Sequence, residues 1–168
     1  YLLGDDERVV TVPWSGPMDR RAYAAAQAVL GNPAGAAGIE VSLGGLALRC
    51  LSGSVGFAVA GGGFILDRAG TRAGSWTCAS LREGERLVIR RGPWGSWCYL
   101  AFAGALQTRR WLGSAATHAL SGLGGGALRV GQELTVTDAA PVPRPGDFPC
   151  PVAARPRQIA RVTMGPQD

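Results

Sequence analysis

Residues 13–40, PWSGPMDRRAYAAAQAVLGNPAGAAGIE, contain the strongest helix signal in the chain, and both ends of the helix are marked. Pro17 suits a first helical turn, because the N–H that proline lacks would be unpaired there anyway. Asp19 places a carboxylate near the positive end of the helix dipole, and the Gly-Asn-Pro sequence at 31–33 ends the helix. We therefore predict a helix over Pro17–Leu30. It packs on a β structure through a face made mainly of alanine, with Met18, Ala22, Ala25, Ala26 and Val29.

The rest of the chain consists of short apolar segments separated by glycine-rich turns. Apolar and polar residues alternate with a period of two, as in Ile39–Leu43, and the chain has 26 glycines. Short strands at this spacing indicate an all-β, mainly antiparallel barrel or sandwich with one main helix. Further strand candidates are Arg8–Val12, Val55–Val59, Phe64–Asp67, Ser75–Ser80, Arg86–Arg90, Trp97–Ala103 and Glu133–Thr137.

The composition changes after Asp138, where six prolines fall within residues 139–157. Because proline cannot donate a hydrogen bond to a sheet, this segment is predicted to be a sheet-incompatible linker. The predicted organisation is a barrel domain at 1–138, the linker, and residues 158–168. This last part is either the start of an incomplete second half or a strand, Gln158–Met164, that folds back on the barrel.

Composition argues against several classes of function. No run of eighteen apolar residues occurs, so no membrane span is expected, and acidic Asp5–Glu7 does not fit the basic start of a signal peptide. The net charge of +5 comes from arginine alone, in scattered pairs without interleaved aromatics, which disfavours nucleic-acid binding. The four cysteines and one histidine lack zinc-site spacing, so we expect reduced thiols, a cytoplasmic protein and no metal.

Six segments carry a family resemblance: SGPMDRRAY at 15–23, GNP at 31–33, IEVSLGG at 39–45, YLAFAG at 99–104, LGS at 112–114 and GLGG at 122–125. Together they resemble the allophanate hydrolase subunit 2 family, also known as KipA, whose members include a component of 5-oxoprolinase. That family is related to the carboxyltransferase part of biotin-dependent urea carboxylase. The resemblance covers Pro13 to Val136 and implies a cyclophilin-like β-barrel.

The resemblance also implies a function: one subunit of an ATP-dependent amide-processing enzyme, active only with a subunit 1 or KipI-type barrel protein. Such complexes open 5-oxoproline to glutamate, or process urea-derived amides by carboxyl transfer. ATP would be bound by the complex, and biotin would be attached to a separate carrier. Whether copies of this chain also form a homo-oligomer is not decided by the resemblance. The alternative is a non-catalytic regulatory or interaction barrel that has lost the active residues.

The helix start supplies the first group of candidate site residues. Ser15 and Asp19 either cap the helix or bind substrate, because exposed N–H groups at a helix start attract a carboxylate or phosphate. Simple alternation points Glu40 away from the core; buried in the barrel it would need an arginine partner. The intact motifs make Asp19 and Glu40 catalytic candidates, and Ser15, Met18 and Asn32 substrate-binding candidates.

The loop at 112–125, LGSAATHALSGLGG, supplies the second group. Ser114 and His118 are catalytic candidates, and Thr117 is a substrate-binding candidate. We expect the pocket where the Ser15–Asp19 helix start meets the Ser114–His118 loop.

Two departures from the family pattern favour the non-catalytic alternative. Family members often carry arginines in the 112–125 loop, suited to a carboxylate, where this chain has Ala115, Ala116 and Leu120. They also carry a T-V-Q-D-x-G-R-like segment that residues 1–12 do not show. The glycine triplets at 61–63 and 124–126 lack a P-loop lysine, so tight turns are their expected role.

Overall fold

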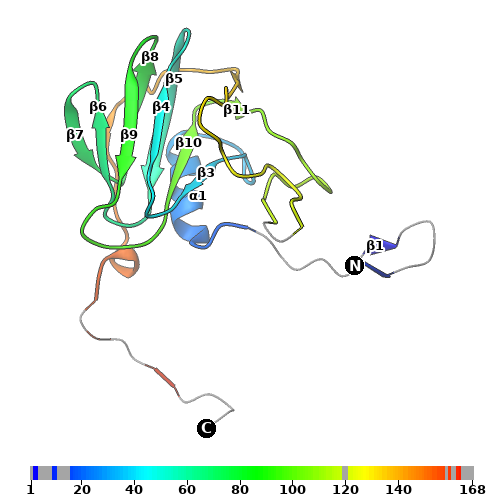
Figure 1. Cartoon of the computed structure of the whole chain (residues 1–168). Coiled ribbons are helices and arrows are strands. Elements are labelled where there is room, and N and C mark those ends of the chain that lie inside the picture. The colour runs from blue at the N-terminus through cyan, green and yellow to red at the C-terminus, as the bar shows by residue number, and fades with distance from the viewer. Residues whose placement is uncertain are drawn as a thin grey trace.

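The structure, a computed structural model, describes residues 2–3, 9–10, 16–118, 121–157, 159 and 162–163. Two main antiparallel sheets face each other around one core (Figure 1). The five-stranded sheet consists, in spatial order, of β13 (Gly146–Asp147), β8 (Thr77–Arg82), β5 (Ser54–Ala60), β10 (Cys98–Phe102) and β3 (Ile39–Val41). The four-stranded sheet consists of β4 (Leu46–Arg49), β9 (Arg86–Arg90), β6 (Ile65–Arg68) and β7 (Thr71–Gly74).

The remaining described elements are small apart from one α-helix. Strands β1 (Leu2–Leu3) and β2 (Val9–Val10) pair with each other, as do β11 (Ala105–Leu106) and β12 (Val136–Thr137). Helix α1 spans Arg20–Val29, and η1 (Val152–Ala154) is one 3-10 turn. The expected fold class, mainly antiparallel β structure with one main helix, is confirmed.

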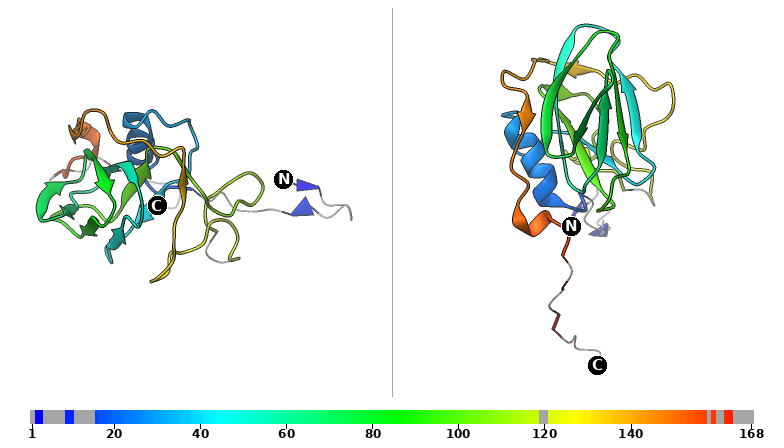
Figure 2. Two further views of the ribbon diagram at one scale, coloured as in Figure 1. Left: turned by 90° about the horizontal axis from the view of Figure 1, so that it is seen from above. Right: turned by 90° about the vertical axis from the view of Figure 1, so that its left-hand side faces the viewer.

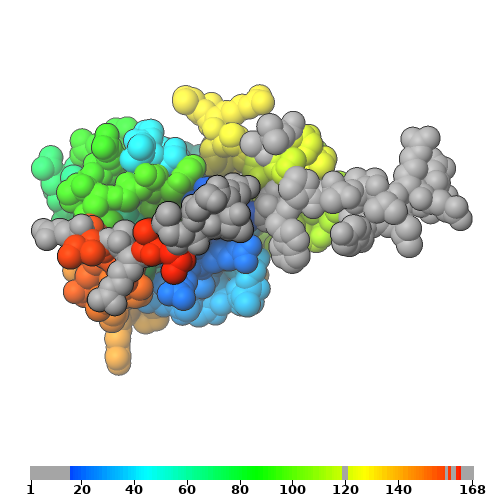
Figure 3. Space-filling model, turned by 90° about the horizontal axis from the view of Figure 1, so that it is seen from below, coloured from blue at the N-terminus to red at the C-terminus, as the bar shows by residue number. Residues whose placement is uncertain are grey.

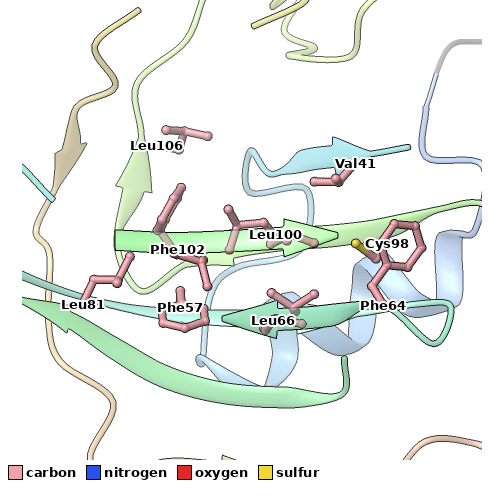
Figure 4. Close-up of a cluster of buried hydrophobic side chains, with 12 residues drawn as sticks. Val41, Phe57, Phe64, Leu66, Leu81, Cys98, Leu100, Phe102 and Leu106 are labelled. Carbon is pink, nitrogen blue, oxygen red and sulfur yellow. The ribbon is translucent and has the colours of Figure 1, made fainter. Parts of the chain in front are cut away.

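The core lies between the two sheets (Figure 4). Alternation sends one set of side chains inward from each sheet, among them Phe57, Leu66, Leu100 and Phe102. Strands β5 and β10 are buried along nearly their whole length, because α1 covers their other face. Because both faces of these strands are buried, their sequences are continuous runs of apolar and small residues.

Helix α1 packs on β5 and β10 through alanine, as predicted (Figure 2). Ala22 and Ala26 are buried against small side chains of the sheet, which allows a close approach. The predicted face is wrong at its two ends. Met18 is 70% exposed because it precedes the helix, and Val29 is 38% exposed. Gln27, which is not part of the predicted apolar face, is buried and hydrogen-bonded.

The helix begins later than predicted. Asp19 is the N-cap, so the helix starts at Arg20, and Pro17 lies outside it. The predicted C-terminal end is confirmed. Leu30 is the C-cap and Gly31 follows with a φ of +72°, a conformation that glycine adopts without strain.

The segment after Asp138 packs along the five-stranded sheet. Gly56 donates to the Ala140 carbonyl oxygen at 2.7 Å, and Gly146–Asp147 pair with β8 as β13. A Cβ at Gly56 would lie 2.8 Å from that oxygen, so the approach requires glycine. The prediction that residues 139–157 are incompatible with a sheet is therefore wrong: the sheet bonds use residues between the prolines. Figure 3 shows this segment, in orange, beside α1, in blue.

Most predicted strands are present, but several short ones were missed. Strands β4, β7, β11 and β13 lack a sustained alternating pattern, since each has two to four residues. Of the predicted strand Arg8–Val12, only Val9–Val10 are described, and Gln158–Met164 lies mostly outside the described residues. No helix in the described part of the chain has the length and apolarity needed to cross a membrane.

Candidate functional site

The start of α1 is tied to β3 and β10 by a polar cluster. The Met18 backbone N–H donates to Glu40 Oε2 at 2.9 Å, and the Tyr99 hydroxyl donates to the same oxygen at 2.8 Å. The Asp19 backbone N–H donates to the Tyr99 hydroxyl at 2.7 Å. Glu40 and Tyr99 are Cα partners in the β3–β10 pairing, so both side chains lie on the face that carries α1.

Asp19 acts as the cap of α1. Its Oδ1 accepts hydrogen bonds from the backbone N–H groups of Arg21 at 3.1 Å and Ala22 at 3.0 Å. Together with Glu40 and Tyr99, it pairs four N–H donors around the helix start. Most of the donors that sequence analysis offered to a ligand carboxylate are therefore used inside the fold.

Glu40 is exposed and points away from the core, as simple alternation predicted. The alternative, a charge buried inside the barrel and paired with an arginine, is wrong. The ion pairs of the described residues are Arg68–Glu85 and Arg90–Asp67, and neither includes Glu40. Both described hydrogen bonds of Glu40 use Oε2, so Oε1 is the oxygen that can accept from a further group.

Tyr99 is the member of this cluster that sequence analysis missed as a site residue. It is only 2% exposed, and burial, with the nearby Glu40 and Asp19 carboxylates, raises the pKa of its phenol well above the usual value. The phenol thus stays protonated and remains a donor to Glu40. A signal did exist: Tyr99 is the one polar-tipped residue in the buried run of β10, and a buried hydroxyl needs a partner.

Asn32 joins the end of α1 to the sheet. Its side-chain N–H group donates to Gln27 Oε1 at 2.6 Å and to the Phe102 carbonyl oxygen at 2.8 Å. Gln27 in turn donates to the carbonyl oxygens of Ala36 and Ala37 at 3.0 and 3.2 Å. Both amides are thus engaged in holding the helix and the loop after it.

The Ser114–His118 loop makes its hydrogen bonds locally. Ser114 Oγ accepts from the Ala116 N–H at 3.1 Å, and Thr117 Oγ1 donates to the Gly126 carbonyl oxygen at 3.3 Å. His118 Nδ1 bonds the Ser121 hydroxyl, and the His118 N–H donates to the Leu123 carbonyl oxygen at 2.9 Å. These contacts fix the loop on itself.

The two predicted halves of the site are not joined by contacts of the described residues. No described hydrogen bond or ion pair links residues 16–19 to residues 114–118. Two hollows lined by described residues also lie elsewhere: one on the outer face of the four-stranded sheet, the other beside β6, β7 and β8. Ser15 lies outside the described residues, so its proposed role stays a prediction.

The glycine triplet at 61–63 forms a packed turn. The Gly63 N–H donates to the Trp94 carbonyl oxygen at 2.7 Å, and a Cβ at Gly63 would lie 2.3 Å from the Trp94 ring nitrogen. The 61–63 triplet is therefore a packed turn and does not fit a phosphate cradle. No cluster of three metal-binding side chains occurs among the residues that the structure describes.

Comparison with protein families gives a match over most of the chain. The family model of the carboxyltransferase domain, subdomain A and B, matches residues 10–168. A putative urea carboxylase of Emericella nidulans is 34% identical over 126 residues, which is 74% of this chain and 10% of that protein. The urea amidolyase of Saccharomyces cerevisiae is 29% identical over 116 residues, 69% of this chain and 6% of that protein.

Solved structures agree with the sequence relatives. TTHA0988 superimposes with a TM-score of 0.73 and 33% identity, covering 82% of this chain and 51% of that one. The urea amidolyase of K. lactis superimposes with a TM-score of 0.68 and 26% identity, covering 73% of this chain and 8% of that one. The chain thus spans 51% of the TTHA0988 chain in one crystal form and 28% in two others, and at most 10% of the two curated relatives.

Proposed function

The chain belongs to the family of the carboxyltransferase domain, subdomain A and B, and from this premise we propose that it is one part of a biotin-dependent, ATP-using enzyme complex that acts on a small amide. The family match over residues 10–168 is the observation that carries the proposal. The substrate we propose is 5-oxoproline, opened to glutamate, with a urea-derived amide as the related choice. The named relatives, a putative urea carboxylase and a urea amidolyase, support the amide class.

Amide chemistry defines what the chain must supply. Resonance makes an amide unreactive toward water, so it is activated by phosphorylation or carboxylation, and fixed hydrogen-bond donors stabilise the charge that develops on its oxygen. Biotin, on a separate carrier, would supply the carboxyl group when bound. ATP is assigned to the rest of the complex, because the packed 61–63 turn does not fit its phosphates.

Within this chain, the Glu40–Tyr99 cluster is the proposed substrate-facing group. Glu40 Oε2 is held by the Met18 N–H and the Tyr99 hydroxyl, so the carboxylate has a fixed orientation. Oε1 can then accept the N–H of an amide substrate, which positions that amide against the helix start. Ser15, Ser114, Thr117 and His118 are proposed to border the same site in the assembled complex.

We propose two assembly partners. The first is a second half of the protein, which we propose begins with residues 158–168 and packs on this half. The exposed fractions of three apolar side chains near this end support a packing partner: 74% for Val152, 79% for Ile159 and 83% for Val162. A subunit 1 or KipI-type barrel protein is the second partner, and a homo-oligomer is the remaining possibility for the assembly. Relatives in which this region is a small part of a much longer chain support the need for further domains.

The test is turnover by the complex reconstituted with a KipI-type subunit, a biotinylated carrier, bicarbonate, ATP and either 5-oxoproline or urea. With 5-oxoproline we expect ATP-dependent glutamate formation, and with urea ATP-dependent consumption of urea; Glu40→Gln should lower the rate at least about tenfold, as for loss of a positioned carboxylate. Glu83→Gln, on an exposed turn, is the matched control and should keep activity. Equal activity of Glu40→Gln and wild type would remove Glu40 from the site.

A second candidate is the non-catalytic interaction barrel. It is favoured because the helix-start donors, Asn32 and the Ser114–His118 loop make hydrogen bonds to other groups of this chain. Groups used in this way are not free to bind a substrate. This candidate predicts a stable complex with a KipI-type partner and no turnover with either amide.

A further inference from the structure

The outer face of the four-stranded sheet carries a concentration of arginine. Alternation places Arg49, Arg72, Arg86 and Arg90 on the side opposite the core residues Leu66, Leu87 and Ile89. We call these four residues, with Asp67 between them, the arginine face. It holds four cations and one anion, an excess of three positive charges in a chain whose net charge is +5.

Two of these arginines oppose each other, and neither belongs to an ion pair among the residues that the structure describes. Arg49 and Arg86 are Cα partners in the β4–β9 pairing, and both are exposed. Like charges directly opposite each other destabilise an antiparallel pair. Asp67 does not relieve them, since its carboxylate lies 3.4 Å from Arg90 and its Cα partner on β7 is Arg72.

The centre of the face has the make-up of a protein interface. Ile65, 39% exposed, and half-buried Val88 lie among the arginines. A hollow lined by Asp67, Ala69, Gly70, Arg86, Val88 and Arg90 indents the surface there. Arginine is enriched in protein interfaces, and charges at an interface set partner choice. Helix α1 and the C-terminal segment cover the other sheet and leave this face open (Figure 2).

We propose that the arginine face is a docking surface for an acidic surface of a protein partner, whose carboxylates neutralise Arg49 and Arg86. An acidic protein is favoured over nucleic acid for two reasons. The outward positions of the four strands carry no aromatic ring on which the bases of a single-stranded nucleic acid could stack. Asp67 would also repel a phosphate backbone, whereas in a protein interface it keeps Arg90 oriented.

The test uses poly-L-glutamate as an acidic polypeptide and a 20-base-pair DNA duplex as the competing probe, both titrated into the whole chain. The variant Arg49→Gln/Arg86→Gln is compared with Arg129→Gln/Arg144→Gln, which removes the same charge from exposed positions outside the face. We expect the first variant to bind poly-L-glutamate about tenfold more weakly than the second, with the difference vanishing at high salt.

The midpoint of thermal unfolding separates loss of the opposed arginine pair from a simple change in net charge. Arg86→Gln should raise the midpoint of thermal unfolding, because it removes the opposed pair, while Arg129→Gln should not. Equal loss of binding in the two double variants would overturn the proposal, as would no binding at low salt. Tighter binding of the duplex, lost in the same face variant, would assign the face to nucleic acid instead. None of these outcomes depends on turnover, so failure here is separate from failure of the proposed enzyme activity.

Discussion

The outward faces of the two main sheets differ in their side chains and in what covers them. The outer face of the five-stranded sheet carries alanines, Ala58, Ala60 and Ala101, and is covered by α1. The outer face of the four-stranded sheet carries Arg49, Arg72, Arg86 and Arg90 and is left open. Small side chains let a helix approach closely, whereas charges keep a face in contact with water or with a charged partner. The covered face is thus the one with small side chains, and the open face is the one with charges.

The largest expected effect comes from adding volume under α1. Ala101→Leu should lower the free energy of unfolding by about 1–3 kcal/mol, because the buried alanine has no room for three more carbons. Ala47→Leu, the same change on the open face, should change it by no more than about 0.5 kcal/mol. Urea unfolding of both variants measures these changes. Similar losses in the free energy of unfolding would show that the two faces tolerate added volume equally.

Alkaline pH should destabilise the core between the two sheets next. Burial raises the pKa of the Cys98 thiol to about 12. Below about pH 9 the thiol is protonated in both the folded and the unfolded chain; above it, only the unfolded chain loses the proton, so stability falls as pH rises. The expected slope is up to about 1.4 kcal/mol per pH unit between roughly pH 9 and 11. Burial also raises the pKa of Tyr99, which adds to the loss above about pH 10.

The control for this prediction is Cys98→Ala. It should cost some stability at neutral pH through lost packing, and its unfolding free energy should fall less steeply from about pH 9 to 11. An unchanged slope would mean that Cys98 is not the titrating group.

Removal of the helix cap should have a moderate effect. Asp19→Ala leaves the N–H groups of Arg21 and Ala22 without their acceptor and should cost about 0.5–2 kcal/mol. Asp19→Asn, still a good cap, should retain most of that stability. If Asp19→Asn preserves stability yet lowers turnover of the complex, Asp19 also serves the substrate site; if both are preserved, it is a cap alone.

The smallest expected effect is a gain on the open face. Arg86→Gln should raise the free energy of unfolding by about 0.2–1 kcal/mol, the size of a cross-strand pair interaction. The gain should shrink in high salt, where exposed charges are screened. A loss of stability in Arg86→Gln would show that Arg86 has a structural partner on this sheet.

Local features of the sequence predicted a large part of the fold. The alanine face of α1, the end of the helix at Gly31 and the central strands β5 and β10 were all visible as patterns of neighbouring residues. The error at the start of the helix also has a local cause. Pro17 and Asp19 both suit a helix start, and only the capping bonds of Asp19 decide between them.

The candidate site was predicted in part. Glu40 and Asp19 were identified, but Tyr99, which joins them, was not, because its role depends on a hydrogen bond across 59 positions of the sequence. Asp19 and Asn32 have definite bonding partners within the fold, yet whether any predicted site residue meets a substrate stays a prediction.

The sequence by itself determined the family, the helix with its alanine face, and the succession of short strands, because these follow from residue types and their spacing along the chain. Tertiary structure alone decided which side chains meet. The β3–β10 register places Glu40 beside Tyr99, the β4–β9 register opposes Arg49 to Arg86, and β13 forms between prolines. Registers are set by contacts between residues far apart in the chain, and a local pattern does not specify its partner.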